Sequence, residues 1–175
     1  KEEHVDVTSY TFVALLKGCK CLQSLQKAHE CHAEIVKEGF ERDPYVGSSL
    51  VDFYCEVGLL EEAREVFNDL SVQDVVVWTS LIAEYNRRGF PHEALDCIAE
   101  MEDNGVSMDA AAYVCGLKAC GSMGFLGVKK GEEIHAEVRK KGLLLTKDVA
   151  LHTALVYMYA KCGSLLKARQ VFDEI

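Results

Sequence analysis

An internal repeat is the feature that most constrains how this chain can fold. Residues 49–70, SLVDFYCEVGLLEEAREVFNDL, align without gaps to residues 154–175, ALVYMYAKCGSLLKARQVFDEI, and nine of the 22 aligned positions are identical. A shorter match joins residues 16–19, LKGC, to residues 117–120, LKAC. Such a period indicates copies of one structural unit that stack on each other, because a single unit could not bury its own apolar face.

The apolar residues within each unit have helical spacing. Leu50 and Phe53 lie three positions apart before Gly58, and Ala63 and Phe67 lie four positions apart after it. Each unit is therefore expected to be two helices joined by a turn. The expected fold class is all-α: an α-α superhelix, a right-handed solenoid of helix–turn–helix repeats with a concave groove.

Extra residues lengthen the second half of the array. The spacing between matching segments grows by four residues along the chain, and the additions fall near 124–131 and 143–147. Both stretches are flanked by glycine. Turns can lengthen at such places without disturbing packed helices, so the repeat is expected to continue through them.

The composition is that of a folded chain with a continuous core. Of the 175 residues, 49% are hydrophobic, yet no apolar run approaches the roughly 20 residues needed to cross a bilayer. No membrane segment is expected, and the first residues resemble neither a signal peptide nor a transit peptide. The eight cysteines lie in apolar segments and are expected to be reduced, buried thiols.

The charge of the chain limits how it could bind a polyanion. A formal net charge of −9 and a pI of about 5.1 argue against a broad electrostatic grip on nucleic acid. A protein that reads unpaired bases can instead confine its basic residues to one groove. Any binding by this chain alone is expected to be weak.

The units resemble pentatricopeptide repeats, in particular the plant class in which motifs called P, L and S alternate. The resemblance rests on the pattern LKAC…IHAEV…VALHTALVYMYAKCGSLLKARQVFDE and covers nearly the whole chain. It divides the chain into the end of a preceding repeat (1–8), an L motif (9–43), an S motif (44–74), a P motif (75–109), an L motif with a four-residue surplus (110–148) and a truncated S motif (149–175).

The resemblance also assigns residues to RNA recognition. In this family the fifth and last residues of a motif together read one base, while the second residue packs against base faces. The base-reading residues would be Ser48 with Asp74, Thr79 with Asp109, and Thr153, and the base-packing residues would be Tyr45, Val76 and Ala150. A hydroxyl paired with a carboxylate suits guanine, whose Watson–Crick edge offers N–H donors to the carboxylate. Two adjacent guanines are therefore predicted at the first S motif and the P motif.

The two L motifs lack a polar fifth residue. They carry Val13 with Asp43 and Val114 with Asp148, and a valine cannot donate the hydrogen bond that base reading needs. The resemblance therefore implies that these positions read weakly or not at all. The L motifs are expected to be spacers.

Structural roles compete with these assignments. A serine or threonine on a first helix can be an ordinary polar residue, and an aspartate before a helix can be an N-cap worth about 1 kcal/mol. The two roles of the aspartates are compatible with each other. The aromatic residues Phe12, Trp78 and Tyr113, at the fourth place of their motifs, are expected in the core and not as stacking platforms.

Two patterns suggest catalysis or a metal but are incomplete. Residues 32–34 and 135–137, both His-Ala-Glu, match half of a zinc deaminase signature, but no Cys-x-x-Cys or Pro-Cys accompanies them. Cys19 and Cys21 near His29 do not have the spacing of structural zinc ligands. The chain is therefore expected to be no enzyme and to hold no metal or cofactor.

The predicted function is sequence-specific binding of single-stranded RNA, one base per competent repeat. The resemblance implies a monomer in a chloroplast or mitochondrion that takes part in RNA editing, splicing or stability, together with editing or splicing co-factor proteins. The alternative is a helical-repeat scaffold that binds proteins, because solenoids commonly hold peptides and an acidic chain suits a basic partner. The pairing of fifth and last residues favours RNA.

Overall fold

The computed structural model describes residues 7–22, 25–146 and 148–174. These residues form ten α-helices and two short 3-10 helices, and no strand lies among them, so the all-α prediction is confirmed. In chain order they are α1 (Ser9–Leu22), α2 (Leu25–Lys37), α3 (Pro44–Val57), α4 (Leu60–Asp69), α5 (Val75–Arg88), α6 (Pro91–Asp103), α7 (Ala110–Ser122), η1 (Gly124–Gly127), α8 (Val128–Lys140), η2 (Leu143–Thr146), α9 (Val149–Lys161) and α10 (Leu165–Asp173). None of the described helices is long and apolar enough to span a bilayer.

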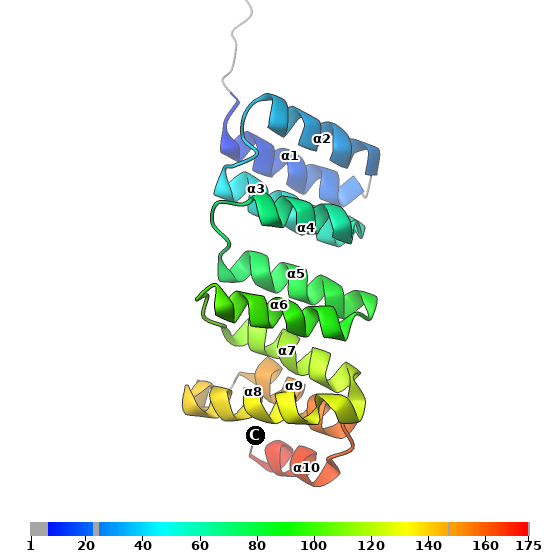
Figure 1. Ribbon diagram of the computed structural model, residues 1–175, viewed down its shortest axis with the longest axis vertical. Coiled ribbons are helices and arrows are strands. Elements are labelled where there is room, and N and C mark those ends of the chain that lie inside the picture. Colours follow the sequence, from blue (N-terminus) through cyan, green and yellow to red (C-terminus); the bar gives the residue numbers. More distant parts are fainter. Residues whose placement is uncertain (1–6, 23–24, 147, 175) are drawn as a thin grey trace, which may run out of the picture. The chain divides into compact units, whose positions relative to one another are not determined.

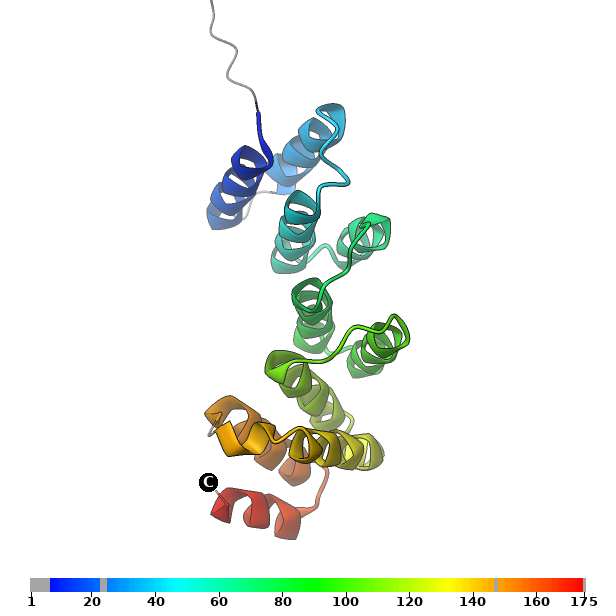
Figure 2. The same cartoon turned by 90° about the vertical axis from the view of Figure 1, so that its left-hand side faces the viewer.

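The chain divides into two compact units, Lys1–Leu81 and Ile82–Ile175. Within the first unit, α1 packs on α2 and α3, and α3 packs on α4 (Figure 1). Within the second, α7 packs on α6, α8 and α9, and the red helix α10 lies beside the orange α9 (Figure 2). Each unit is therefore built from helical hairpins whose neighbouring first helices are in contact, as the repeat predicts.

The helix boundaries follow the repeat closely. Helices α1, α3, α5, α7 and α9 begin at residues 9, 44, 75, 110 and 149, the first residues of the five predicted motifs. Helices α9 and α10 also begin at the places that match the starts of α3 and α4 in the aligned repeat. The assignment of each hairpin as P, L or S type remains a prediction.

Local sequence signals fix where the first helices begin. Asp43 accepts hydrogen bonds from the backbone N–H groups of Tyr45 and Val46 at the start of α3, and Pro44 occupies the first turn. Proline suits this position because the N–H that it lacks would have no partner within the helix. Pro91 has the same place in α6.

Glycine ends the first helix in both hairpins that are predicted to be S motifs. Gly58 has a φ of 89° and Gly163 a φ of 82°, a left-handed conformation that other residues rarely adopt. The backbone N–H of Gly58 donates to the carbonyls of Tyr54 and Cys55, which otherwise lack partners at the helix end. The turn between the two helices is therefore built into the repeat.

The surplus residues of the fourth hairpin, the second predicted L motif, form two 3-10 turns. Helix η1 lies between α7 and α8, and η2 lies between α8 and α9, in the two glycine-flanked stretches. A Cβ atom on Gly127 would lie only 2.0 Å from the carbonyl oxygen of Cys120, so the first turn requires glycine. The extra residues are accommodated while α7 and α9 stay packed on each other.

The aromatic residues expected in the core are buried. Phe12, Trp78 and Tyr113 are at most 2% exposed, which confirms the prediction. The Phe12 ring lies 5.3 Å from that of Phe40, and the Trp78 ring lies 4.4 Å from that of Phe67. The first contact joins α1 to the turn after α2, and the second joins α5 to α4 of the preceding hairpin, so these three aromatic residues serve packing.

The described cysteines are free thiols, and all of them except the half-buried Cys115 are buried, as expected. Burial raises the pKa of Cys31 and of Cys120 to about 12 each, and the neighbouring Cys19 adds to the effect at Cys31. The side chain of Cys21 lies outside the described residues.

Candidate nucleic-acid interface

The three hydroxyls predicted to read bases share one local geometry. Each lies one turn into a first helix and donates to the backbone carbonyl four residues earlier: Ser48 to Pro44 (2.6 Å), Thr79 to Val75 (2.7 Å) and Thr153 to Val149 (2.6 Å). The competing structural role is therefore present. Because the proton is held by the helix, each hydroxyl oxygen retains lone pairs that can accept from a ligand.

The aspartates that end the predicted motifs are N-caps with spare capacity. The Oδ1 atom of Asp74 accepts from the N–H groups of Val76 and Val77, both at 3.0 Å. Asp148 caps α9 in the same way, and Asp109 caps α7 by accepting from the N–H of Ala112. Their second carboxylate oxygens have no hydrogen-bond partner among the described residues. Capping thus leaves one oxygen on each aspartate for a ligand donor.

Asp43 differs from the other three. Its Oδ1 caps α3, and its Oδ2 accepts a 2.6 Å hydrogen bond from the Ser9 hydroxyl. Partial burial opposes ionisation of this carboxyl, but the hydrogen bonds from Ser9 and the backbone outweigh it and lower the pKa of Asp43. Both oxygens are occupied, which agrees with the expectation that this L motif does not read a base.

The residues assigned to base packing are accessible. Tyr45 is 77% exposed and Val76 is 64% exposed, and Ala150 is also exposed. Their exposure leaves apolar contact area, including the ring of Tyr45, beside the reading positions.

A groove crosses the first helices of the second unit. It has a volume of about 630 Å³ and is lined by residues of α5, α7 and α9, among them Asn86, Val114, Lys118, Thr153 and Tyr157. We call it the first-helix groove. It brings together three sequence-predicted positions, because Ala150 also lines it.

The first-helix groove is free of negative charge. None of the described residues that line it carries a carboxylate, whereas Arg87 and Lys118 do line it. Within the same unit, Asn86 donates from Nδ2 to the backbone carbonyl of Cys115 at 2.8 Å and so connects α5 to α7. A groove of this kind accepts an anionic or neutral polar ligand more readily than a cation.

Some groove residues were not found from the sequence. Asn86, Lys118 and Tyr157 lie one or more turns beyond the reading positions, and their motif places carry no recognised role. Lys118 had a signal, because residues 16–19 and 117–120 match and put a lysine in both L motifs. Arg87, which also lines the groove, and its neighbour Arg88 both donate to the buried Glu84, at 2.7 and 2.6 Å.

Other predicted pairs are not joined in the structure. Ser48 and Asp74 share no hydrogen bond within the described ranges. Thr79 belongs to the first unit and Asp109 to the second. Both pairings therefore remain predictions from the register of the repeat.

The two histidines of the half deaminase signature have structural contacts. His32 shares a 2.7 Å hydrogen bond with the Tyr54 hydroxyl, and His135 shares one of 2.9 Å with the Tyr159 hydroxyl. In both cases a second helix is tied to the first helix of the next hairpin. No group of three potential metal ligands exists in the part of the chain that the structure describes.

A second cavity lies on the second helices of the first unit. It measures about 480 Å³ and lies between α2 and α4 over α3. Four carboxylates line it, from Glu41, Glu62, Glu65 and Asp69, together with Arg42 and the His32–Tyr54 pair. We call it the second-helix cleft.

Comparison with known proteins agrees with this helical-repeat architecture. A family model described as "PPR repeat family", the abbreviation for pentatricopeptide repeat, matches residues 73–122, and one described as "PPR repeat" matches residues 48–75 and 151–175. The chain therefore carries pentatricopeptide repeats.

Curated relatives extend the similarity to the whole chain. Pentatricopeptide repeat-containing protein At4g18520, chloroplastic, from Arabidopsis thaliana is 36% identical over 175 residues, which are 100% of this chain and 28% of that protein. The Arabidopsis thaliana protein At3g09040, mitochondrial, is 31% identical over 100% of this chain and 17% of its own length. The chain thus spans between 17% and 28% of the length of these two relatives.

Solved structures show the same fold. The maize pentatricopeptide repeat protein PPR10 superposes with a TM-score of 0.73 at 21% identity, over 97% of this chain and 24% of that one. The structure of PPR10 in complex with an 18-nucleotide psaJ RNA element gives a TM-score of 0.72, also at 21% identity, over 96% of this chain and 25% of that one. The fold is that of helical-repeat solenoids.

Proposed function

We propose that this chain binds single-stranded RNA on its first helices and reads bases one repeat at a time. It carries pentatricopeptide repeats, and a protein of the same fold has been solved with an RNA element bound. The observation that carries the proposal is the first-helix groove: a chain of net charge −9 keeps carboxylates out of a groove that gathers Val114, Ala150 and Thr153. Exclusion of negative charge is what a polyanion requires.

The reading chemistry is that of guanine at two adjacent positions. Ser48 with Asp74 and Thr79 with Asp109 each combine a hydroxyl oxygen with a carboxylate oxygen that has no hydrogen-bond partner among the described residues. The carboxylate accepts from guanine N1–H and N2–H. The hydroxyl, which donates to the helix, can accept from a base N–H or, after rotation, donate to a ring nitrogen of the base. Thr153 is a further purine-reading position.

The L-type hairpins do not read bases in this proposal. Val13 and Val114 offer no hydrogen bond, and Asp43 has both oxygens occupied. This alternation of readers and non-readers supports assignment of the array to the plant class of P, L and S motifs.

The cellular setting is proposed from the relatives. One is named chloroplastic and another mitochondrial, so we assign the chain to one of these organelles and to RNA editing, splicing or stability. The chain binds RNA as a monomer in this proposal, and co-factor proteins carry out any catalytic step. His32 and His135 hold neighbouring hairpins together through their hydrogen bonds to tyrosine, and no catalytic role is assigned to them.

Titration against four RNAs tests the proposal. Short labelled single strands, identical except for GG, AA, UU or CC at the centre, are titrated at low salt with the chain and with Thr79→Asn. We expect a preference for GG, and we expect Thr79→Asn to weaken GG binding by about 1–3 kcal/mol and to relax the preference. Gln170→Asn, a neutral change on the exposed face of α10, is the matched control and should leave the preference intact.

The alternative of a protein-interaction scaffold has one observation in its favour, the four carboxylates of the second-helix cleft. A scaffold would use that surface and would bind the four RNAs equally and weakly. Equal binding would therefore overturn base reading and favour the scaffold.

A further inference from the structure

The two L-type hairpins share a feature that the reading code does not use. One helical turn after the apolar fifth residue, each first helix carries a lysine: Lys17 follows Val13 in α1, and Lys118 follows Val114 in α7. Residues four apart lie on the same face of a helix. The other three first helices have Asp52, Ala83 and Tyr157 at this place, so the lysine accompanies the loss of the reading hydroxyl.

The charge of these lysines is not neutralised by the protein. Both side chains are exposed, and neither has an ion-pair partner in the part of the chain that the structure describes. Many other basic side chains are paired, as Arg88 is with Glu84 and Lys141 with Glu137. A lysine kept unpaired in a chain with an excess of carboxylates has its charge available for a ligand.

The position of Lys118 indicates which part of an RNA it would meet. It lines the first-helix groove together with Val114 and Thr153, and no carboxylate among the described residues lines that groove. Lys118 lies about 6 Å along the helix axis from Val114, as four residues at about 1.5 Å rise require. An RNA strand whose bases point at the fifth residues of the motifs would have its sugar–phosphate backbone beside those residues, within reach of Lys118.

We propose that Lys17 and Lys118 bind backbone phosphates, so that the L-type hairpins act as sequence-independent anchors and not as passive spacers. A compact ammonium on a flexible stem suits a phosphate as a point charge, whereas it offers no fixed fork for base edges. The apolar Val13 and Val114 then avoid a hydrogen bond that would favour one base. The proposal rests on the proposed function, since it assigns a second set of first-helix residues to the same RNA.

Salt dependence separates this role from base reading. Lys17→Gln, Lys118→Gln and the double variant are titrated with the GG and UU RNAs over a range of salt concentrations. Each substitution should lower the slope of log affinity against log salt by about 0.7 and weaken binding about fivefold near 0.1 M salt, equally for both RNAs. Lys129→Gln makes the same charge change on the exposed face of the second helix α8 and should not alter the slope.

The outcomes are distinguishable. Wild-type binding with an unchanged slope in the double variant would overturn the anchor role and leave the proposed function intact. A loss confined to the GG RNA would also overturn it, because the lysines would then read bases. If the wild-type chain bound none of the RNAs even at low salt, the proposed function would fail, and the anchor role with it. Equal thermal melting of all variants confirms that the fold is unaltered.

Discussion

The first-helix groove and the second-helix cleft have opposite electrostatic character. The first-helix groove, about 630 Å³, contains two basic side chains and no carboxylate among its described lining residues, whereas the second-helix cleft, about 480 Å³, contains four carboxylates. The net charge of −9 is therefore distributed unevenly between surfaces. The difference teaches that net charge is a poor guide to whether a repeat protein can bind a polyanion, because binding depends on the local field of one groove.

The two surfaces also differ in what their polar groups do. In the second-helix cleft, His32 is hydrogen-bonded to Tyr54, so its polar atoms stabilise the contact between hairpins. At the start of first helices, Asp74 and Asp109 each cap a helix with one oxygen, while the other oxygen has no hydrogen-bond partner in the described part of the chain. Polar groups of the first kind hold the array together, and those of the second kind can bind a ligand without unfolding it.

The largest expected effect comes from introducing into the first-helix groove a negative charge like those of the second-helix cleft. Val114→Glu places a carboxylate in the groove, beside Lys118. Because like charges brought together cost several kcal/mol, this carboxylate should repel the RNA phosphates, and RNA binding should weaken strongly and equally for all four RNAs. Ala136→Glu, on the exposed face of α8, is the matched control in the same titration. If the two variants weakened binding equally, the groove would not be the binding surface.

A smaller effect should distinguish two aspartates with the same capping role. Asp74→Ala and Asp43→Ala each remove an N-cap and should each lower the free energy of unfolding by about 1 kcal/mol. Only Asp74→Ala should also weaken GG binding, by about 1–3 kcal/mol, because both oxygens of Asp43 are already occupied. Denaturant melts and RNA titrations measure the two quantities. Equal loss of RNA affinity in both variants would refute the distinction.

The histidine–tyrosine contacts should affect stability alone. Tyr54→Phe and Tyr159→Phe each remove one hydrogen bond and should each lower the free energy of unfolding by about 1 kcal/mol. Neither tyrosine lines the first-helix groove, so the affinity for RNA should not change. A loss of RNA affinity in a variant that melts normally would contradict this prediction, because it would show a ligand contact outside the first-helix groove.

The smallest expected effect is a pH dependence from the same contacts. Burial is the main cause that lowers the pKa of His32 and His135 below the ordinary 6.5. The unfolded chain then binds more protons than the folded one as the pH falls below 6.5. Stability from these groups is thus complete above that pH and is lost as the pH falls through the lowered values. Melts of the wild type and of a His32→Gln, His135→Gln variant should converge at low pH, and parallel curves would contradict the assignment.

Much of the fold could be predicted because its signals are local. Asp43, Pro44 and Gly58 act within a few residues of their own positions, so the sequence alone located the start and end of α3. The match between residues 49–70 and 154–175 then extended this to α9 and α10. Even the surplus residues fell in turns, since packed helices leave no other place for them.

The candidate site was less predictable because it depends on side chains from separate helices. The sequence did not show that Asn86 of α5 donates to the backbone of α7, or that Glu84 is buried under Arg87 and Arg88. It also gave no sign that His32 would meet Tyr54, 22 residues away. Lys118 was visible in the repeat, but its unpaired charge acquires meaning only in a groove without carboxylates.

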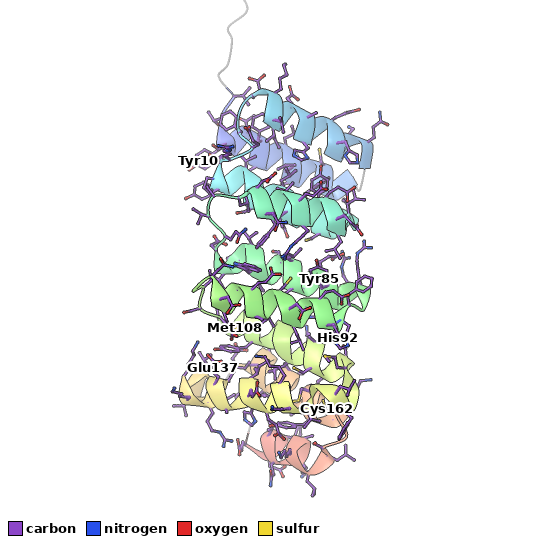
Figure 3. All side chains as sticks on the ribbon, viewed as in Figure 1. Tyr10, Tyr85, His92, Met108, Glu137 and Cys162 are labelled. Atoms are coloured by element: carbon purple, nitrogen blue, oxygen red, sulfur yellow. The ribbon has the colours of Figure 1, made fainter. Side chains whose placement is uncertain are left out.

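The tertiary contacts within the hairpin of α7 and α8 show the same limit. Tyr113 donates a 2.7 Å hydrogen bond to Glu137, which lies on α8 (Figure 3). That hydrogen bond is the main cause that lowers the pKa of Glu137, and Lys141 adds to it. The sequence predicted that Tyr113 would be buried, but not that its hydroxyl would tie α7 to α8.

Mapping the RNA contact surface by NMR tests the central claim most directly. The chain is 19.4 kDa, so backbone amide shifts can be followed while the GG RNA is added. We expect the largest perturbations on the first helices α3, α5, α7 and α9, centred on Ser48, Thr79, Lys118 and Thr153. Perturbations confined to the second helices α2, α4, α6 and α8 would contradict the account, because they would place the ligand away from the first helices.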